Sequence, residues 1–270
     1  MKKVLLIGCG HMGTALLTSW LDSKRYHITI IDPLKYKILK KKFSNKKIKL
    51  INNFSKLDKS ASYNFVIFAT KPIDLNQALV NFSSINLDKK TNIISVVAGK
   101  KIEIFEKNFD NVNNFYRVMP NMPALIGESM NCIVSSKKAN LVNKKEVEKL
   151  FSYSGKTIFL DNENQIDMST AISGSGPGFV FNLIDAMENA AIKLGFDSKT
   201  AKILVTQTFK GSINLLIKNN MTAKELVNTV ATKGGTTEAG LNVMKTRKLH
   251  QTFTELVKVS YKKAKKQGKS

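Results

Sequence analysis

Residues 3–13, KVLLIGCGHMG, decide how the first part of this chain folds. A short apolar run, typical of a buried parallel strand, leads directly into glycines at positions 8, 10 and 13, and residues 12–24 have the apolar spacing of a helix. In this pattern the first glycine permits a tight turn, the second lets the backbone approach a pyrophosphate, and the third lets helix and strand pack closely. The stretch therefore predicts a dinucleotide-binding turn at a helix N-terminus, with a tight turn that binds nothing as the alternative.

Outward from this stretch, strand-like and helix-like segments alternate. The strand-like runs are HITIID, KIKLI, FVIFATKP, NIISVVAG, NNFYRVMP, NCIVSS and KTIFLD. Such alternation predicts an α/β Rossmann-type domain, a doubly wound parallel sheet, over residues 1–161. Helical patterns alone follow, so we predict an all-α domain over residues 162–270. Its helices are apolar on more than one face, which suits burial against a second subunit.

Composition narrows the class of protein. The chain has 270 residues, of which 43% are apolar, which is an ordinary globular value. The apolar run near the start is shorter than the roughly 7–15 residues of a secretory signal, and no run approaches the roughly 18–20 of a membrane span. We therefore expect a soluble, cytoplasmic protein. Two distant cysteines, Cys9 and Cys132, and three scattered histidines predict neither a disulfide framework nor a metal site.

The net charge of +23 raises the alternative of a nucleic-acid-binding protein. The excess is almost entirely lysine, spread along the chain, and the arginines that base readout favours are limited to Arg25, Arg117 and Arg247. We therefore interpret the charge as a solvated lysine surface and expect no nucleic-acid partner.

Asp32 closes the second strand-like run, roughly 20 residues after the glycine pattern, where an acid usually accepts from the adenosine ribose and favours NAD. Lys35 and Lys37 follow at once and could instead meet a 2′-phosphate. A strand-end aspartate that only caps the next turn is a further alternative. The residues around Asp32 therefore leave the choice between NAD and NADP open.

Two further strand ends, in FATKP and SVVAG, lie where ligands bind in open α/β sheets. We expect Lys71 and the backbone around Ala98 to face the ribose and nicotinamide side of a dinucleotide. A plain surface cation is the alternative for Lys71.

Three later motifs are candidates for the substrate side. In RVMPNMP, prolines on both sides of Asn121 make a stiff loop that can wall a flat pocket; the alternative is a rigid turn between domains. In SGSGPGFVF, residues 174–176 predict an N–H-rich nest before a helix, or plain helix capping. In ATKGGTTEAG, two glycines let the backbone come close, and Thr236 and Thr237 open the next helix with hydroxyls and free N–H groups; the alternative is a plain turn between two helices.

The motifs GCGHMG, ATKP, SVVAG, RVMPNMPALIGE, SGSGPGFVF and KGGTTEAGL stand in the order and spacing of the pyrroline-5-carboxylate reductase family, which this chain resembles from residue 3 to about residue 260. The resemblance implies reduction of the C=N bond of 1-pyrroline-5-carboxylate to L-proline, the last step of proline biosynthesis, with NADPH or alternatively NADH. It also implies a homodimer through the helical domain, and in some members larger rings of dimers.

The residues that we expect to bind the cofactor, with Asn53 added by the resemblance alone, are Gly8, Cys9, Gly10, His11, Met12, Gly13, Asp32, Asn53, Thr70, Lys71, Pro72 and Ala98. Those expected to bind the substrate are Met119, Pro120, Asn121, Ser175, Gly234, Gly235, Thr236 and Thr237.

The chemistry asks for little more than alignment, since hydride transfer needs the two reacting carbons about 3–3.5 Å apart. An imine nitrogen is basic, so a protonated substrate is already activated, and no His or Asp/Glu pair is needed. We expect Thr237 to hydrogen-bond that nitrogen or relay a proton.

Three positions depart from the family's usual motifs: Lys233 replaces a proline, Phe179 replaces a tyrosine, and Met122 replaces a threonine. The remaining alternatives are a reductase of a related cyclic imine, a β-hydroxyacid dehydrogenase-like enzyme and an NADPH-sensing protein. The dehydrogenase is disfavoured because no lysine occurs between Lys156 and Lys193, where its catalytic lysine would lie.

Overall fold

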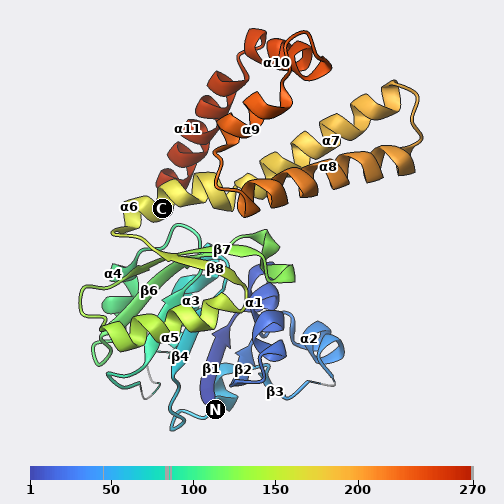
Figure 1. The fold of residues 1–270 in the computed structure, drawn as a ribbon. Helices are drawn as coiled ribbons and strands as arrows, with labels where there is room; N and C mark the ends of the chain where they lie inside the picture. Colours follow the sequence, from blue (N-terminus) through green and yellow to red (C-terminus); the bar gives the residue numbers. More distant parts are fainter. Residues whose placement is uncertain (45, 83–84, 86, 269–270) are drawn as a thin grey trace. The chain divides into compact units, whose positions relative to one another are not determined.

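The computed structural model describes residues 1–44, 46–82, 85 and 87–268, which cluster into two compact units (Figure 1). Unit 1 contains residues 1–175 together with the described end of the chain from Ser260, and unit 2 contains residues 176–259. The chain therefore begins and ends in the same unit.

Unit 1 is built on a sheet whose eight strands have the order β3-β2-β1-β4-β5-β6-β7-β8 in the described residues. β1 pairs in parallel with both β2 and β4, so the strand order reverses at this point and leaves the crevice where α/β sheets bind ligands. The Rossmann-type fold class is thus confirmed. The strands are Lys2–Ile7 (β1), Tyr26–Ile31 (β2), Ile48–Ile51 (β3), Phe65–Phe68 (β4), Asn92–Ser95 (β5), Asn114–Met119 (β6), Ser129–Ser135 (β7) and Gly155–Phe159 (β8).

β7 is the exception to the predicted parallel sheet. It runs antiparallel to β6, with Met119 opposite Cys132, and β8 is again parallel to β7. The connection from β6 to β7 holds only the short 3-10 turn Met122–Ile126 (η3), and a parallel partner would need a crossover of a dozen or more residues. Alternation of patterns does not reveal strand direction, so the sequence could not show this reversal.

Helices cover both faces of the sheet because its strands are apolar on both. Along β1, Leu5 and Ile7 enter one core with residues of α3, α4 and α6, whereas Val4 and Leu6 enter the other with residues of α1 and α5. Buried Trp20 of α1 lies edge-on to a phenylalanine of α5 and donates from Nε1 to the Leu150 carbonyl at 3.0 Å. The helices of unit 1 are His11–Asp22 (α1), Tyr36–Lys42 (α2), Leu75–Phe82 (α3), Ile102–Glu106 (α4), Leu141–Ser152 (α5) and Glu163–Ser169 (α6).

Unit 2 is helical, as predicted. Asp197 caps the second long helix by accepting from the N–H groups of Lys199 and Thr200, and Gly195, at φ 107, ends the first. The helices are Gly176–Lys193 (α7), Ser198–Lys218 (α8), Ala223–Val230 (α9), Thr236–Thr246 (α10) and Leu249–Gln267 (α11), whose end belongs to unit 1. Among the hydrophobic residues of unit 2, which is described throughout, Ala201 and Val205 are the buried ones. Unit 2 taken by itself therefore has hardly any core.

None of the described helices has an apolar stretch of the length needed to span a membrane.

Candidate active site

The predicted cofactor residues of unit 1 gather at one edge of the sheet. They follow β1, β2, β3, β4 and β5, and since these strands are parallel, their carboxyl ends share that edge. The turn after β1 also abuts the end of β4, because a Cβ added at Gly8 would lie 2.9 Å from the Ala69 carbonyl oxygen and 3.0 Å from the Thr70 Cα. The glycine turn therefore lies at the point where the strand order reverses.

The three glycines of the turn have different surroundings. Gly8 has φ +84, and a Cβ added at Gly13 would lie 2.6 Å from the Gly8 carbonyl oxygen, so the protein's own packing requires both. At Gly10, by contrast, an added Cβ would meet nothing within 4 Å. Gly10 is also the N-cap of α1 and no side chain caps that helix end, so backbone N–H groups of the first turn are available. An open backbone at a helix N-terminus fits a pyrophosphate.

Asp32 holds the turn in place from the end of β2. The residue is only 8% exposed, and its carboxylate accepts from the Cys9 N–H at 2.7 Å and from the Lys35 N–H at 2.9 Å. The structure thus contains the capping contact that the sequence offered as an alternative, joined to a second contact that the sequence did not predict. Asp32 therefore ties together the turns after β1 and β2.

Thr70 supplies an unpartnered group beside the same turn. Its Oγ1 is buried and has no hydrogen-bond partner among the described residues, although most buried hydroxyls have one. Lys71, Pro72 and Ala98 are exposed at the ends of the neighbouring strands. Asn53, after β3, is exposed and accepts from the Ser55 N–H, so its side-chain oxygen caps the 3-10 turn Phe54–Lys56. The orphaned hydroxyl and the open Gly10 backbone together fit a dinucleotide.

The corner between β6 and β7 is fixed by Asn121. This side chain is 9% exposed; its Oδ1 accepts from the Ser129 hydroxyl and the Met130 N–H, and its Nδ2 donates to the Ser173 carbonyl at 2.9 Å. The structure brings Met119 to the same place, since a Cβ added at Gly174 would lie 3.0 Å from its methyl group. Asn121 therefore joins the RVMPNMP loop to the segment before unit 2.

The predicted nest at residues 174–176 is wrong. A π-helix, Thr170–Gly174, follows α6 directly, and the Ser175 N–H donates to the Thr170 carbonyl at 2.8 Å. The helical stretch begins earlier than the sequence pattern indicated because Asn162 caps α6 by accepting from the Gln165 N–H. Ser175 therefore has helical backbone and a satisfied N–H. Short π-helical turns within α-helices are frequent at functional sites, and Ser175 directly follows this one.

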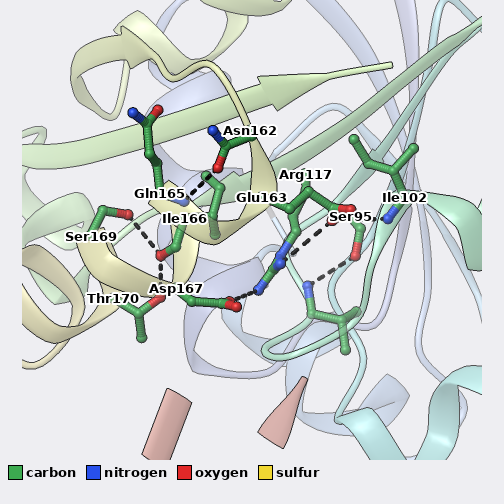
Figure 2. A network of polar contacts seen from close by, with 11 residues as sticks. Ser95, Ile102, Arg117, Asn162, Glu163, Gln165, Ile166, Asp167, Ser169 and Thr170 are labelled. Carbon is green, nitrogen blue, oxygen red and sulfur yellow. Dashed lines mark hydrogen bonds and ion pairs between the residues drawn. The ribbon is translucent and has the colours of Figure 1, made fainter. Parts of the chain in front are cut away.

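A buried ion network beside this segment was not predicted (Figure 2). Arg117 of β6 is 4% exposed, and its guanidinium lies 2.7 Å from an Asp167 oxygen and 3.4 Å from a Glu163 oxygen, both on α6. The available signal was an arginine inside a largely apolar strand, together with acids four residues apart. Neither pattern says that the groups meet, because they are separated by 46 and 50 residues.

The loop ATKGGTTEAG lies in unit 2. Gly234 has φ +76 and donates its N–H to the Glu238 carboxylate at 2.7 Å, while a Cβ added at Gly235 would lie 2.6 Å from the Thr232 hydroxyl. α10 then begins at Thr236 with no side-chain cap, so Thr236 and Thr237 present first-turn N–H groups. Glu238 therefore accepts from the Gly234 N–H, one of the groups that we expected to bind a substrate. The N–H groups at the start of α10 remain available for that role.

Within the described residues, no group of three or more His, Cys, Asp or Glu side chains is arranged to hold a metal ion. Burial raises the pKa of the Cys9 thiol to about 11, so this thiol is neutral at physiological pH.

An open glycine turn where the strand order of a Rossmann-type sheet reverses, followed by a helical unit, defines a dinucleotide-dependent oxidoreductase of two parts. Comparison with known proteins agrees: residues 3–99 match the family described as "NADP oxidoreductase coenzyme F420-dependent", and residues 163–267 match "Pyrroline-5-carboxylate reductase dimerisation". The chain belongs to the pyrroline-5-carboxylate reductase family, as its sequence identity to curated relatives shows.

Two curated relatives support that assignment. The chain is 30% identical to pyrroline-5-carboxylate reductase of Haemophilus influenzae over 94% of this chain and 93% of that protein. It is also 30% identical to pyrroline-5-carboxylate reductase 2 of Bacillus subtilis, over 98% and 94%. Among solved structures, the Plasmodium falciparum pyrroline carboxylate reductase with NADP bound matches with a TM-score of 0.86 at 27% identity, covering 99% of this chain and 98% of that one.

Proposed function

We propose that this chain reduces the C=N bond of 1-pyrroline-5-carboxylate to give L-proline, with a reduced nicotinamide dinucleotide as hydride donor. The observation that carries the proposal is the open turn at Gly10, beside the orphaned hydroxyl of Thr70, in a chain of this family. We assign cofactor binding to residues 1–161 and substrate binding and dimerisation to residues 162–270; the match to the dimerisation family, which begins at residue 163, supports this division.

The cofactor residues proposed are those at the strand ends. Backbone N–H groups after Gly10 bind the pyrophosphate, the Thr70 hydroxyl bonds to the dinucleotide beside them, and Ala98 faces the nicotinamide half. We propose NADPH as the preferred donor. Both oxygens of Asp32 already accept backbone N–H groups, while Lys35 and Lys37 follow it and suit a 2′-phosphate. The Plasmodium falciparum relative, solved with NADP bound, supports the same choice.

On the substrate side, the bound nicotinamide supplies a hydride, and the protein must bind and orient the imine. We propose that the first-turn N–H groups of Thr236 and Thr237 bind the substrate carboxylate, and that the Thr237 hydroxyl oxygen accepts from the N–H of the protonated ring nitrogen. Glu238 keeps the loop in shape by accepting from Gly234. A hydroxyl has too high a pKa to be a strong acid, so Thr237 orients an imine that is already protonated.

We further propose a homodimer formed through unit 2, with larger rings of dimers as the assembly that the family resemblance implies. Large apolar side chains of unit 2 are exposed, among them Phe181 at 53%, Ile203 at 58% and Ile217 at 67%. A unit with so few buried residues does not stabilise itself, and monomers rarely expose so much apolar surface. The match to the dimerisation family supports a second copy of this chain as the partner that covers this surface. We also propose a cytoplasmic location.

The deciding experiment is a reductase assay with purified protein and 1-pyrroline-5-carboxylate, run in parallel with NADPH and NADH. The reduced cofactor's near-ultraviolet absorbance should fall with both, and faster with NADPH at equal concentration. No fall with either cofactor refutes the proposal. A parallel run with a six-membered cyclic imine tests the alternative of a related imine reductase.

A further inference from the structure

The loop between β5 and α4, residues 96–101, carries Ala98 at the edge of the sheet, and its far end is bonded to α6. The N–H of Ile102, the first residue of α4, donates to the Glu163 carboxylate at 3.0 Å. The same carboxylate oxygen lies 3.4 Å from the Arg117 guanidinium. One oxygen of Glu163 therefore connects this loop to β6.

Arg117 fixes where Glu163 can be. Its side chain is 5% exposed, and a guanidinium that far from water needs carboxylate partners, here Asp167 at 2.7 Å and Glu163. A guanidinium is planar, so it sets the relative position of both acids, which lie one helical turn apart on α6. In the sheet Arg117 is paired with Ser95, whose hydroxyl accepts from the Val97 N–H at 3.2 Å. The beginning of the loop is thus held at the same place as its end (Figure 2).

The end of the chain holds the middle of the loop. Gly99 is buried at φ +73, and a Cβ added there would lie 2.6 Å from the Gln267 carbonyl oxygen, in the last turn of α11. Tyr261 on the same helix donates its hydroxyl to the side-chain oxygen of Asn164 on α6 at 2.8 Å. The end of α11 therefore contacts both the loop and the helix that carries Glu163.

We propose that Glu163, oriented by Arg117, is a positioning residue for the nicotinamide half of the cofactor site, and that the last turn of α11 holds the loop 96–101 against it. This inference rests on the proposed function only in requiring that a dinucleotide binds. In a Rossmann-type site the adenosine half lies toward β2 and the nicotinamide half beyond β4, over β5. Loosening the loop after β5 therefore weakens contacts to one half of the ligand and spares the other.

The test measures binding rather than turnover. Glu163→Ala removes the acceptor for the Ile102 N–H, Glu163→Gln keeps an acceptor oxygen without the charge, and Glu106→Ala removes an exposed acid at the end of α4 as the matched control. Titration calorimetry gives the Kd of NADPH and of 2′,5′-ADP, which contains only the adenosine end. We expect Glu163→Ala to raise the Kd of NADPH about tenfold, the effect of one lost hydrogen bond to a charged group, and to leave that of 2′,5′-ADP within about twofold.

Glu163→Gln should recover most of the NADPH affinity, and Glu106→Ala should match the unchanged protein. Gly99→Ala, which disturbs the loop from the opposite side, should reproduce the selective loss and decides the matter if Glu163→Ala does not fold. The proposal is overturned if NADPH affinity is unaffected in both variants, or if both ligands weaken equally. Failure of the unchanged protein to reduce the imine while it still binds NADPH would count against the proposed function alone; failure to bind NADPH would overturn both.

Discussion

The glycine turn gives the sharpest prediction, because its second and third glycines differ in what surrounds them. In Gly13→Ala, the new Cβ would lie 2.6 Å from the Gly8 carbonyl oxygen, whereas ordinary contact begins at 3.4 Å. α1 must therefore move by about 0.8 Å from the turn that it packs against. Overpacking costs about 1–3 kcal/mol, and this contact belongs at the upper end, about 2–3 kcal/mol, because the new Cβ meets backbone and not a flexible side chain. The better helix propensity of alanine returns about 1 kcal/mol. We expect a net loss of about 1–2 kcal/mol in the free energy of unfolding.

Gly10→Ala is the matched control. Its Cβ meets nothing within 4 Å, and its φ of −67 suits alanine. The weaker N-cap of alanine and the lower entropy of the unfolded chain nearly cancel, so the free energy of unfolding should change by less than about 0.5 kcal/mol. The new methyl group occupies the open space where a pyrophosphate approaches the backbone. We therefore expect a large loss of NADPH affinity with almost no loss of stability.

Two measurements separate the variants: urea unfolding followed by circular dichroism, and NADPH titration by fluorescence. Gly13→Ala should lose both stability and affinity, and Gly10→Ala should lose affinity only. Unchanged NADPH affinity in Gly10→Ala would refute the assignment of the pyrophosphate to this turn. Unchanged stability in Gly13→Ala would refute the packing argument.

Three further predictions concern other parts of the chain. Phe181→Glu, on the exposed apolar surface of unit 2, should shift the assembly toward monomers in sedimentation velocity, since a charge cannot be buried there without cost; an unchanged mass contradicts the proposed interface. Thr237→Ala should lower kcat/KM for the imine about tenfold or more while NADPH affinity stays the same, and an equal loss of both would place the loop outside the substrate site. Burial raises the pKa of Cys9 from 9.0 to about 11, so the thiol loses its proton at lower pH in the unfolded chain than in the folded one. The thiol's contribution to the free energy of unfolding should therefore fall as pH rises from 9 to 11. Cys9 should also resist labelling by iodoacetamide at pH 8 unless the protein is unfolded. Rapid labelling of Cys9 in the native protein would contradict its burial.

Much of the fold was predictable because it depends on short-range patterns. The apolar run before Gly8 predicted β1 and the glycine spacing predicted the turn, and the cap that Asp197 forms at the start of α8 is likewise a local contact. In each case the physical cause lies within a few residues: a strand buried on both faces, a backbone that must turn, or an N–H group that needs an acceptor.

The features that were missed or mispredicted depend on distant contacts. The direction of β7 follows from the short connection after Asn121, which pattern alone does not distinguish from a crossover. The start of the helical stretch at Asn162 was hidden because the glycines near residue 174 resemble a break. For the Asp32 carboxylate, the sequence allows either a ribose ligand or a cap. Only the fold shows that it accepts from backbone N–H groups of two separate turns.

By itself, then, the sequence determined that this chain has a dinucleotide turn on a Rossmann-type sheet, followed by helices, and that its motifs belong to one family of reductases. Only the tertiary structure decided which polar groups meet. Arg117 became a partner of Glu163 and Asp167 because α6 packs against β6 and β7, and Gly99 met the last turn of α11 because the end of that helix folds back onto unit 1. Local patterns fix backbone conformation over a few residues, whereas a buried charge finds its partners only when the whole core closes around it.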